Sequence, residues 1–140
     1  MIRILFADDN PTMQENIRDF IAAEADMVVA GRAETGRLAI ELACSDEQEW
    51  DAVLLDLTLP DQSGVETLKE IRRCRPLLPV LIVSGFPENQ YGAKVIKAGA
   101  NGYLAKERIP EELVPAIRAV TQGLNYLSSK RAHRPAEAPA

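Results

Sequence analysis

No stretch of this sequence is apolar for long enough to cross a membrane. The longest apolar run, Leu77–Val83, is interrupted by Pro79, whereas a membrane-spanning helix needs roughly 18 apolar residues or more. The beginning of the chain also lacks the apolar stretch of a secretory signal, because Ile4–Ala7 leads directly into Asp8 and Asp9. We therefore expect a protein without a membrane segment that stays in the cytoplasm.

Cysteine and histidine are scarce. The chain has two cysteines, Cys44 and Cys74, and one histidine, His133. Two cysteines are too few for a disulfide framework, and neither has the CxxC or histidine spacing of a zinc site. The sequence therefore predicts two buried, reduced thiols, to which it assigns no chemistry.

An excess of positive charge is also missing. Lysine and arginine total 16 against 21 aspartates and glutamates, which gives a net charge of −5, whereas a protein that binds a phosphate backbone needs clustered cations. We expect no direct nucleic-acid binding by this chain. What the sequence does have is ordinary globular composition, with 46% hydrophobic residues over 140 positions, enough for one domain with a full hydrophobic core.

Short apolar runs alternate with longer segments of helical period. The runs are Ile2–Ala7, Met27–Ala30, Ala52–Leu55, Val80–Val83 and Gly102–Leu104. This alternation predicts an α/β fold with a parallel sheet, in which the continuously apolar third and fourth strands are central. From residue 128 the chain has no aromatic or β-branched residue. We therefore predict a domain over residues 1–127, followed by a flexible tail or interdomain linker over residues 128–140.

Polar residues follow four of the five predicted strands. Asp8 and Asp9 follow the first, Asp56 the third and Ser84 the fourth, and Lys106 lies just beyond the fifth. In open α/β sheets, ligands bind beyond the carboxyl ends of the strands. Three carboxylates at one sheet edge repel each other unless a cation joins them, and oxygen ligands of this kind suit Mg²⁺.

The same residues have plainer interpretations. An aspartate after a strand is often a helix cap or a turn former. Lys106 could simply neutralise one aspartate in a salt bridge. Only the conjunction of these residues at one edge favours a magnesium site facing a lysine that attracts an anion.

Together these motifs resemble the receiver (CheY-like) domains of two-component response regulators. The resemblance rests on FADDNP, on LLDLTLPDQSG, on the SG that follows VLIV, and on GANGYLAK. The ADDNP start and the GANGYLAK and GLNYLS segments are similar to the LuxR/FixJ (NarL) type. The resemblance implies a flavodoxin-like, doubly wound (βα)5 fold with a five-stranded parallel sheet. Its strand order would be 2-1-3-4-5, which receivers share with flavodoxin.

The resemblance implies a phosphoacceptor and a metal site. Asp56 would take a phosphoryl group from the phosphohistidine of a sensor histidine kinase. Asp9, Asp56 and the backbone carbonyl of Thr58 would hold Mg²⁺, with Asp8 acting through water. The metal would neutralise and position the phosphoryl oxygens, which is most of what phosphoryl transfer requires.

Further roles follow from the same resemblance. Lys106 and Ser84 would each contact a phosphoryl oxygen, and Ser84 with Tyr103 would form the switch that reports phosphorylation. Thr58 and Phe86 would lie beside the path of the hydrolytic water, where the bulky Phe86 is expected to shield the acyl phosphate. Alternatively, Phe86 points into a protein contact, and Tyr103 is a half-buried packing residue. Glu107 stands where many receivers have proline, so the cis bond common there is not assumed.

The function expected from these residues is a phosphorylation-controlled binding module, not an enzyme with turnover. Its output would be a LuxR-type DNA-binding domain, absent from this chain; a homodimer formed on phosphorylation is left open. One alternative is a stand-alone receiver that signals through protein contacts. Another is an aspartyl-nucleophile phosphatase, but Thr58 occupies the place where such enzymes have a second aspartate. A nucleotide or flavin site would need a glycine-rich turn where Asp8 and Asp9 stand.

Overall fold

The computed structural model describes residues 1–134, in which five strand–helix units are followed by a short hairpin. In chain order the elements are β1 (Ile2–Ala7), α1 (Pro11–Ala22), β2 (Met27–Ala33), α2 (Gly36–Cys44), β3 (Ala52–Asp56), α3 (Gly64–Cys74), β4 (Val80–Ser84), α4 (Glu88–Lys97), β5 (Gly102–Ala105), a 3-10 turn η1 (Lys106–Arg108), α5 (Ile109–Thr121), β6 (Asn125–Leu127) and β7 (Lys130–His133).

The strands form one sheet in the order β2-β1-β3-β4-β5-β6-β7. The first five strands are parallel and follow the predicted order 2-1-3-4-5, so the flavodoxin-like, CheY-like fold is confirmed. The sheet is nevertheless wider than predicted. The short strand β6 pairs parallel to β5, and β7 pairs antiparallel to β6, so β5 is not an edge strand.

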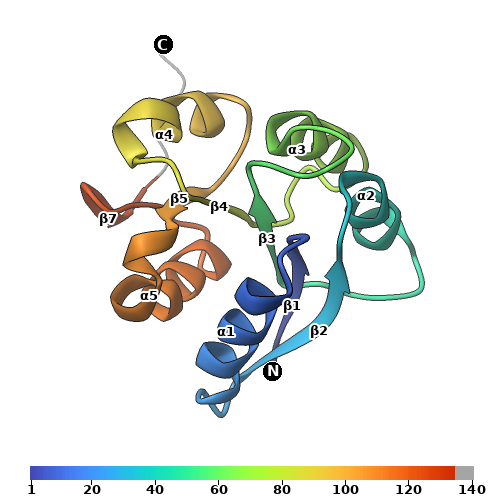
Figure 1. Ribbon diagram of the computed structural model, residues 1–140, viewed down its shortest axis with the longest axis horizontal. Helices are drawn as coiled ribbons and strands as arrows, with labels where there is room; N and C mark the ends of the chain where they lie inside the picture. Colours follow the sequence, from blue (N-terminus) through green and yellow to red (C-terminus); the bar gives the residue numbers. More distant parts are fainter. Residues whose placement is uncertain (135–140) are drawn as a thin grey trace.

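Helices cover both faces of this sheet (Figure 1). Helices α1 and α5 pack on one face, where Phe6, Leu54 and Ile117 belong to one buried cluster. Helices α2, α3 and α4 cover the other face, where Leu55 and Ile71 belong to a second cluster. Every residue of β3 and β4 is buried, which confirms that these strands are central.

Side-chain caps fix where two helices begin next to the carboxyl edge of the sheet. The Asn10 side chain accepts a hydrogen bond of 3.1 Å from the Met13 N–H, and Pro11 occupies the first position of α1. Ser63 likewise accepts from the Glu66 N–H at 3.1 Å at the start of α3. Both helices therefore begin at a residue whose side chain caps the first turn.

The C-terminal hairpin is bound to α4 and α5. Tyr126 is buried, and its hydroxyl donates a 2.7 Å hydrogen bond to the buried Glu112 of α5. Arg131 lies 3.3 Å from the same carboxylate. Ser129 donates from both its backbone N–H and its hydroxyl to Glu88 in the first turn of α4. These contacts hold the hairpin against the domain although its composition is poor for a strand.

The predicted domain boundary after residue 127 therefore falls inside the hairpin. The part of the predicted tail over residues 128–133 is a turn and a strand. The remainder of that tail, residues 135–140, lies outside the described residues. Within residues 1–134, no helix is long and apolar enough to cross a membrane.

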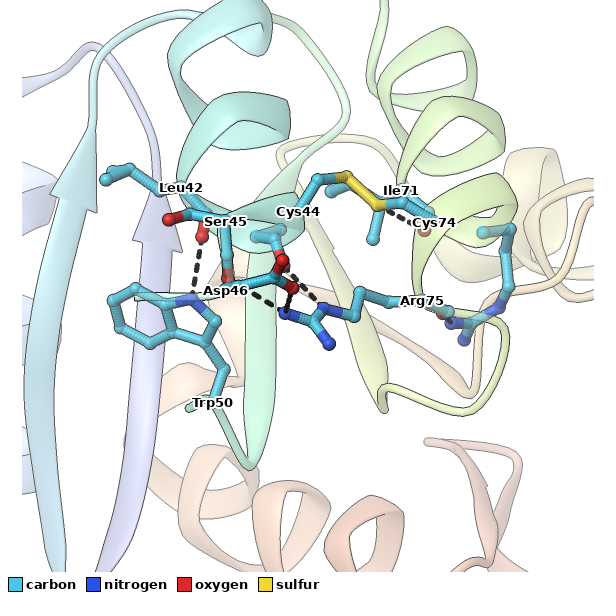
Figure 2. Close-up of a disulfide and its surroundings, with 10 residues drawn as sticks. Leu42, Cys44, Ser45, Asp46, Trp50, Ile71, Cys74 and Arg75 are labelled. Carbon is cyan, nitrogen blue, oxygen red and sulfur yellow. Dashed lines mark hydrogen bonds and ion pairs between the residues drawn. A yellow bond between two sulfur atoms is a disulfide. The ribbon is translucent and has the colours of Figure 1, made fainter. Parts of the chain in front are cut away.

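The prediction that the two cysteines are buried, reduced thiols is wrong. Cys44 and Cys74 form a disulfide with a Cα–Cα distance of 5.7 Å (Figure 2). They are the last residues of α2 and α3, and Cys74 is exposed. The side-by-side packing of these helices brings together two residues separated by 30 positions, which the spacing of the cysteines could not show.

Candidate functional site

Three carboxylates meet at the carboxyl edge of the sheet. Asp8 and Asp9 follow β1, and Asp56 is the last residue of β3. One oxygen from each lies within 4.8 Å of the others; Asp8 and Asp56 are buried and Asp9 is exposed. The structure thus brings together the residues that the sequence predicted would converge.

Asp8 is held firmly but is incompletely satisfied. Its Oδ1 accepts a 2.7 Å hydrogen bond from the Asn10 N–H, and its backbone carbonyl accepts one of 2.5 Å from Gln14 Nε2. Its Oδ2 is fully buried and makes no hydrogen bond, although Lys106 Nζ lies 3.2 Å away as an ion pair. A buried carboxylate oxygen without a hydrogen bond normally has a ligand or an ordered water as its partner.

Lys106 contacts two of the three carboxylates. It follows β5 directly, and its Nζ lies 3.2 Å from Asp8 and 3.4 Å from Asp56. Burial alone would lower the pKa of Lys106, but the charges of Asp56 and Asp8 outweigh it and raise that pKa. Lys106 is therefore cationic at neutral pH, and it bridges two carboxylates instead of neutralising one.

Asp56 has an unusual protonation equilibrium. Burial raises the pKa of its carboxyl to about 6, and the charge of Asp8 adds to that rise. The hydrogen bond that Oδ1 accepts from the Thr58 N–H at 3.2 Å opposes the rise. The charge of Lys106 also opposes the rise. At pH 7 most of the Asp56 side chains are therefore ionised, as a nucleophile must be.

The donor set fits a hard divalent cation. Asp8, Asp9 and Asp56 supply three negative charges, and Lys106 supplies one positive charge. The excess negative charge, the all-oxygen ligands and the unsatisfied Asp8 Oδ2 match what Mg²⁺ requires. A bound cation would also relieve the repulsion between Asp8 and Asp56.

Ser84, Phe86 and Tyr103 are linked through one backbone segment. Ser84 is buried at the end of β4, and its hydroxyl accepts a 3.1 Å hydrogen bond from the Phe86 N–H. Tyr103 is fully buried, and its hydroxyl donates a 2.6 Å hydrogen bond to the Phe86 carbonyl. Burial also raises the pKa of Tyr103. Tyr103 is thus neither half-buried nor a simple packing residue.

The Phe86 side chain leans toward α4. Its ring makes an edge-to-face contact with Tyr91, with centroids 5.2 Å apart, and it remains 43% exposed. The alternative considered for Phe86 was that it points into a protein contact, and the contact with Tyr91 is of that kind. A shielding role for Phe86 stays a prediction.

Gly64 permits a close approach that the sequence analysis did not single out. Its N–H donates a 2.7 Å hydrogen bond to the Leu57 carbonyl. A Cβ at this position would lie 2.5 Å from the Asp56 carbonyl oxygen and 2.7 Å from Leu57 Cα. The glycine of the SG pair in LLDLTLPDQSG therefore packs α3 directly against the backbone of Asp56 and Leu57.

The backbone beside Lys106 is ordinary. No peptide bond in the described residues is cis, so the Lys106–Glu107 bond is trans. Lys106, Glu107 and Arg108 form the turn η1, from which α5 continues.

Comparison with known proteins identifies the family of this chain. Residues 4–118 match the family model described as the response regulator receiver domain. The chain belongs to that family. It is 40% identical over 122 residues to the transcriptional regulatory protein YxjL of Bacillus subtilis (strain 168). The aligned region covers 87% of this chain and 55% of that protein. It is 33% identical over 129 residues to the response regulator UvrY of Escherichia coli (strain K12), covering 92% of this chain and 58% of that protein.

Solved structures show the same fold. A LuxR-family two-component response regulator from Aurantimonas sp. SI85-9A1 superposes with a TM-score of 0.83 at 33% identity, covering 91% of this chain and 89% of that one. The response regulator domain of Thermotoga maritima CheB gives a TM-score of 0.79 at 28% identity, over 87% and 97% of the two chains. The receiver spans a little over half the length of the curated relatives described above.

Proposed function

We propose that this receiver accepts a phosphoryl group on Asp56 from the phosphohistidine of a sensor histidine kinase, with Mg²⁺ as its cofactor. One observation carries the proposal. The ionisable Asp56 carboxylate lies beside the carboxylates of Asp8 and Asp9. The ammonium group of Lys106 lies 3.4 Å from Asp56, and its other ion pair within residues 1–134 is with Asp8. This arrangement can bind a cation and a phosphoryl anion side by side.

In the proposed reaction, Asp56 attacks phosphorus. A phosphorus–oxygen bond to Asp56 forms, the phosphorus–nitrogen bond of the kinase histidine breaks, and that nitrogen keeps the electron pair. Mg²⁺ held by Asp9, Asp56 and the Thr58 carbonyl would supply charge neutralisation at the phosphoryl oxygens. Asp8 would act mainly through a bound water.

Lys106 and Ser84 complete the proposed site. As the phosphoryl group arrives, the Lys106 ammonium would exchange part of its contact with Asp56 for a phosphoryl oxygen. The Ser84 hydroxyl would donate to another oxygen. Ser84 now accepts from the Phe86 N–H, and Tyr103 holds the Phe86 carbonyl. Movement of Ser84 would therefore be felt by the segment that leads into α4.

The output surface would be built from α4, β5 and α5. The C-terminal hairpin binds Glu88 on α4 and Glu112 on α5, so this surface leads directly to the end of the chain. In a longer protein the hairpin would connect it to a LuxR-type DNA-binding domain. A stand-alone receiver would use the same surface for a protein partner or for a homodimer.

The reaction is stoichiometric, so the domain would have no turnover beyond loss of its own phosphoryl group. We place it in the cytoplasm, where the kinase domains of such systems present their phosphohistidine. A phosphatase with an aspartyl nucleophile would instead need a second aspartate two residues after the first, and Thr58 occupies that position after Asp56.

The test compares radiolabel transfer with turnover. A phosphorylated histidine kinase should transfer label to the wild-type chain in the presence of Mg²⁺, up to one phosphoryl group per chain. An aspartyl phosphatase would instead release phosphate continuously from free phosphoesters without accumulating label. Catalytic turnover of that kind would reject the proposal.

A second experiment addresses the output surface. Beryllofluoride, a phosphoryl mimic, should change amide exchange in α4, β5, α5 and the hairpin, because the Ser84–Phe86–Tyr103 links lead there. Changes confined to α2 and α3 would contradict this assignment.

A further inference from the structure

The disulfide between Cys44 and Cys74 joins the last residues of α2 and α3 (Figure 2). The Asp56 site lies at the other end of α3, where Gly64 packs against the Asp56 backbone. Cys74 is exposed and Cys44 is half-buried. Both sulfur atoms belong to residues that the phosphoryl-transfer proposal does not use. Disulfides in reducing compartments are usually transient and serve catalysis or redox sensing.

The neighbouring Arg75 holds the two helix ends together without help from the sulfur bridge. Its Nε donates a 3.1 Å hydrogen bond to the Ala43 carbonyl, and its Nη2 donates one of 2.8 Å to the Ser45 carbonyl. The same group lies 3.7 Å from Asp46. Arg75 therefore joins the end of α3 to the residues on both sides of Cys44 through contacts that do not involve the sulfur atoms.

The opposite ends of α2 and α3 are also joined, but through the loop that follows Asp56. The Asp61 carboxylate accepts hydrogen bonds of 2.8 and 3.0 Å from the N–H groups of Gly36 and Arg37 at the start of α2. Gln62 donates a 2.8 Å hydrogen bond to Thr67 of α3. The relative position of the two helices is thus coupled to the loop over residues 57–63.

We propose that Cys44 and Cys74 form a reversible thiol–disulfide site that responds to the glutathione redox couple. In the oxidised state the bridge fixes α2 against α3 and restrains the loop over residues 57–63. In the reduced state the hydrogen bonds of Arg75 and the apolar packing of the two helices would still join those helix ends. The site would add a redox input on the side of the domain away from α5.

The chemistry uses oxidised glutathione as the oxidant. The exposed Cys74 thiolate attacks one sulfur of oxidised glutathione, and the glutathione sulfur–sulfur bond breaks to release one glutathione thiolate. The Cys44 thiolate then attacks Cys74 Sγ, which closes the protein disulfide and releases the second glutathione thiolate. Two cysteines are oxidised, two glutathione molecules are formed, and the two cysteine protons balance the two released thiolates. Reduced glutathione reverses both steps.

The first test equilibrates the wild-type chain with graded ratios of oxidised to reduced glutathione, traps free thiols with a maleimide, and measures intact mass. We expect one intramolecular disulfide that opens completely in excess reduced glutathione and re-forms in excess oxidised glutathione. Two free thiols throughout, stable glutathione adducts without ring closure, or a bridge between two chains would each overturn the proposal.

Variants separate the steps. Cys44→Ser should accumulate a glutathione adduct on Cys74, and absence of that adduct would contradict the order of attack. Arg75→Ala should slow ring closure several-fold, whereas Arg73→Ala should not, because Arg73 is exposed and its ion pair within residues 1–134 is with Glu70 of its own helix. Equal closure rates in the two arginine variants would contradict the role of Arg75.

The second test asks what the bridge restrains. Oxidised wild type should melt about 10 °C above reduced wild type, as expected for a bridge closing a loop of this length. It should also exchange the amide protons of Gly36 and Arg37 more slowly. The Cys44→Ser/Cys74→Ser variant should show neither difference between the two glutathione conditions. Unchanged exchange at Gly36 and Arg37 in the oxidised wild type would overturn the proposed coupling to the loop.

Discussion

The hydroxyl of Tyr103 donates a 2.6 Å hydrogen bond to the carbonyl oxygen of Phe86. This bond joins β5 to the segment between β4 and α4, while Ser84 accepts from the N–H of the same phenylalanine. One short backbone segment is therefore held by two hydroxyl groups. A ligand that moves the Ser84 side chain would therefore break one of these two contacts.

The acyl phosphate on Asp56 is predicted to be relatively long-lived if Phe86 excludes water from it. Thr58 cannot act as a strong base, and the Phe86 ring has no group to orient water. Phe86→Glu and Phe86→Lys should then change the decay rate several-fold. Single-turnover loss of label measures this rate, with Tyr91→Ala as a control that disturbs the ring contact of Phe86 without adding charge. Equal rates in wild type, Phe86→Ala and the charged variants would remove Phe86 from the mechanism.

Millimolar Mg²⁺ should raise the melting temperature. A cation that binds only the folded carboxylate cluster stabilises it by about 1.4 kcal/mol when its concentration is ten times its Kd, which corresponds to a shift of roughly 3 to 6 °C. Asp9→Ala should abolish most of the shift. Asp19→Ala, which removes an exposed carboxylate from α1, should retain it. If Mg²⁺ leaves the melting temperature of wild type and both variants unchanged, the proposed metal site is wrong.

In the metal-free protein the Asp56 carboxyl should titrate near pH 6, because burial raises the pKa of this group from 3.8 to about 6. Between pH 4 and pH 6 the folded state holds this proton and the unfolded state does not. The contribution of Asp56 to the free energy of unfolding therefore falls as pH rises through that range, by on the order of 3 kcal/mol.

Carboxyl ¹³C NMR of Asp56 measures the titration directly. Denaturation of wild type and Asp56→Asn between pH 4 and pH 8 measures its energetic consequence. The variant should gain stability relative to wild type up to about pH 6 and then show a constant difference. A midpoint near pH 4 would contradict the burial argument.

Gly64→Ala should destabilise the fold. The added Cβ would lie 2.5 Å from the Asp56 carbonyl oxygen, a backbone atom of a central strand that cannot move aside. We expect a loss of about 1 to 3 kcal/mol, typical of overpacking. Gly85→Ala is the matched control, because a Cβ there meets no heavy atom within 4 Å. Equal unfolding midpoints in urea for the two variants would contradict the close approach at Gly64.

The sequence predicted the site better than the periphery of the fold. Asp8, Asp56 and Lys106 could be placed together because the carboxyl ends of parallel strands share one edge, whatever the details of packing. The hairpin could not be predicted, because residues 128–133 lack strand-forming side chains and depend on long-range contacts with Glu88 and Glu112.

The disulfide and its arginine were missed for a related reason. Cysteine spacing along the chain does not show that the last turns of α2 and α3 lie side by side. In the sequence, Arg72 and Arg75 look first like charges favourable to the dipole of a helix end, and secondarily like a basic patch. In the structure, Arg72 donates hydrogen bonds to the Gly99 and Leu78 carbonyls, so it joins segments that are distant in sequence.

The most direct test of the central claim identifies which carboxylate carries the phosphoryl group. Borohydride reduces an aspartyl phosphate to homoserine, and peptide mass spectrometry then locates the converted residue. After reaction with a phosphorylated histidine kinase and Mg²⁺, the account predicts homoserine at position 56 and no conversion in Asp56→Asn. Conversion at position 8 or 9, or no conversion in a labelled wild-type chain, would contradict it.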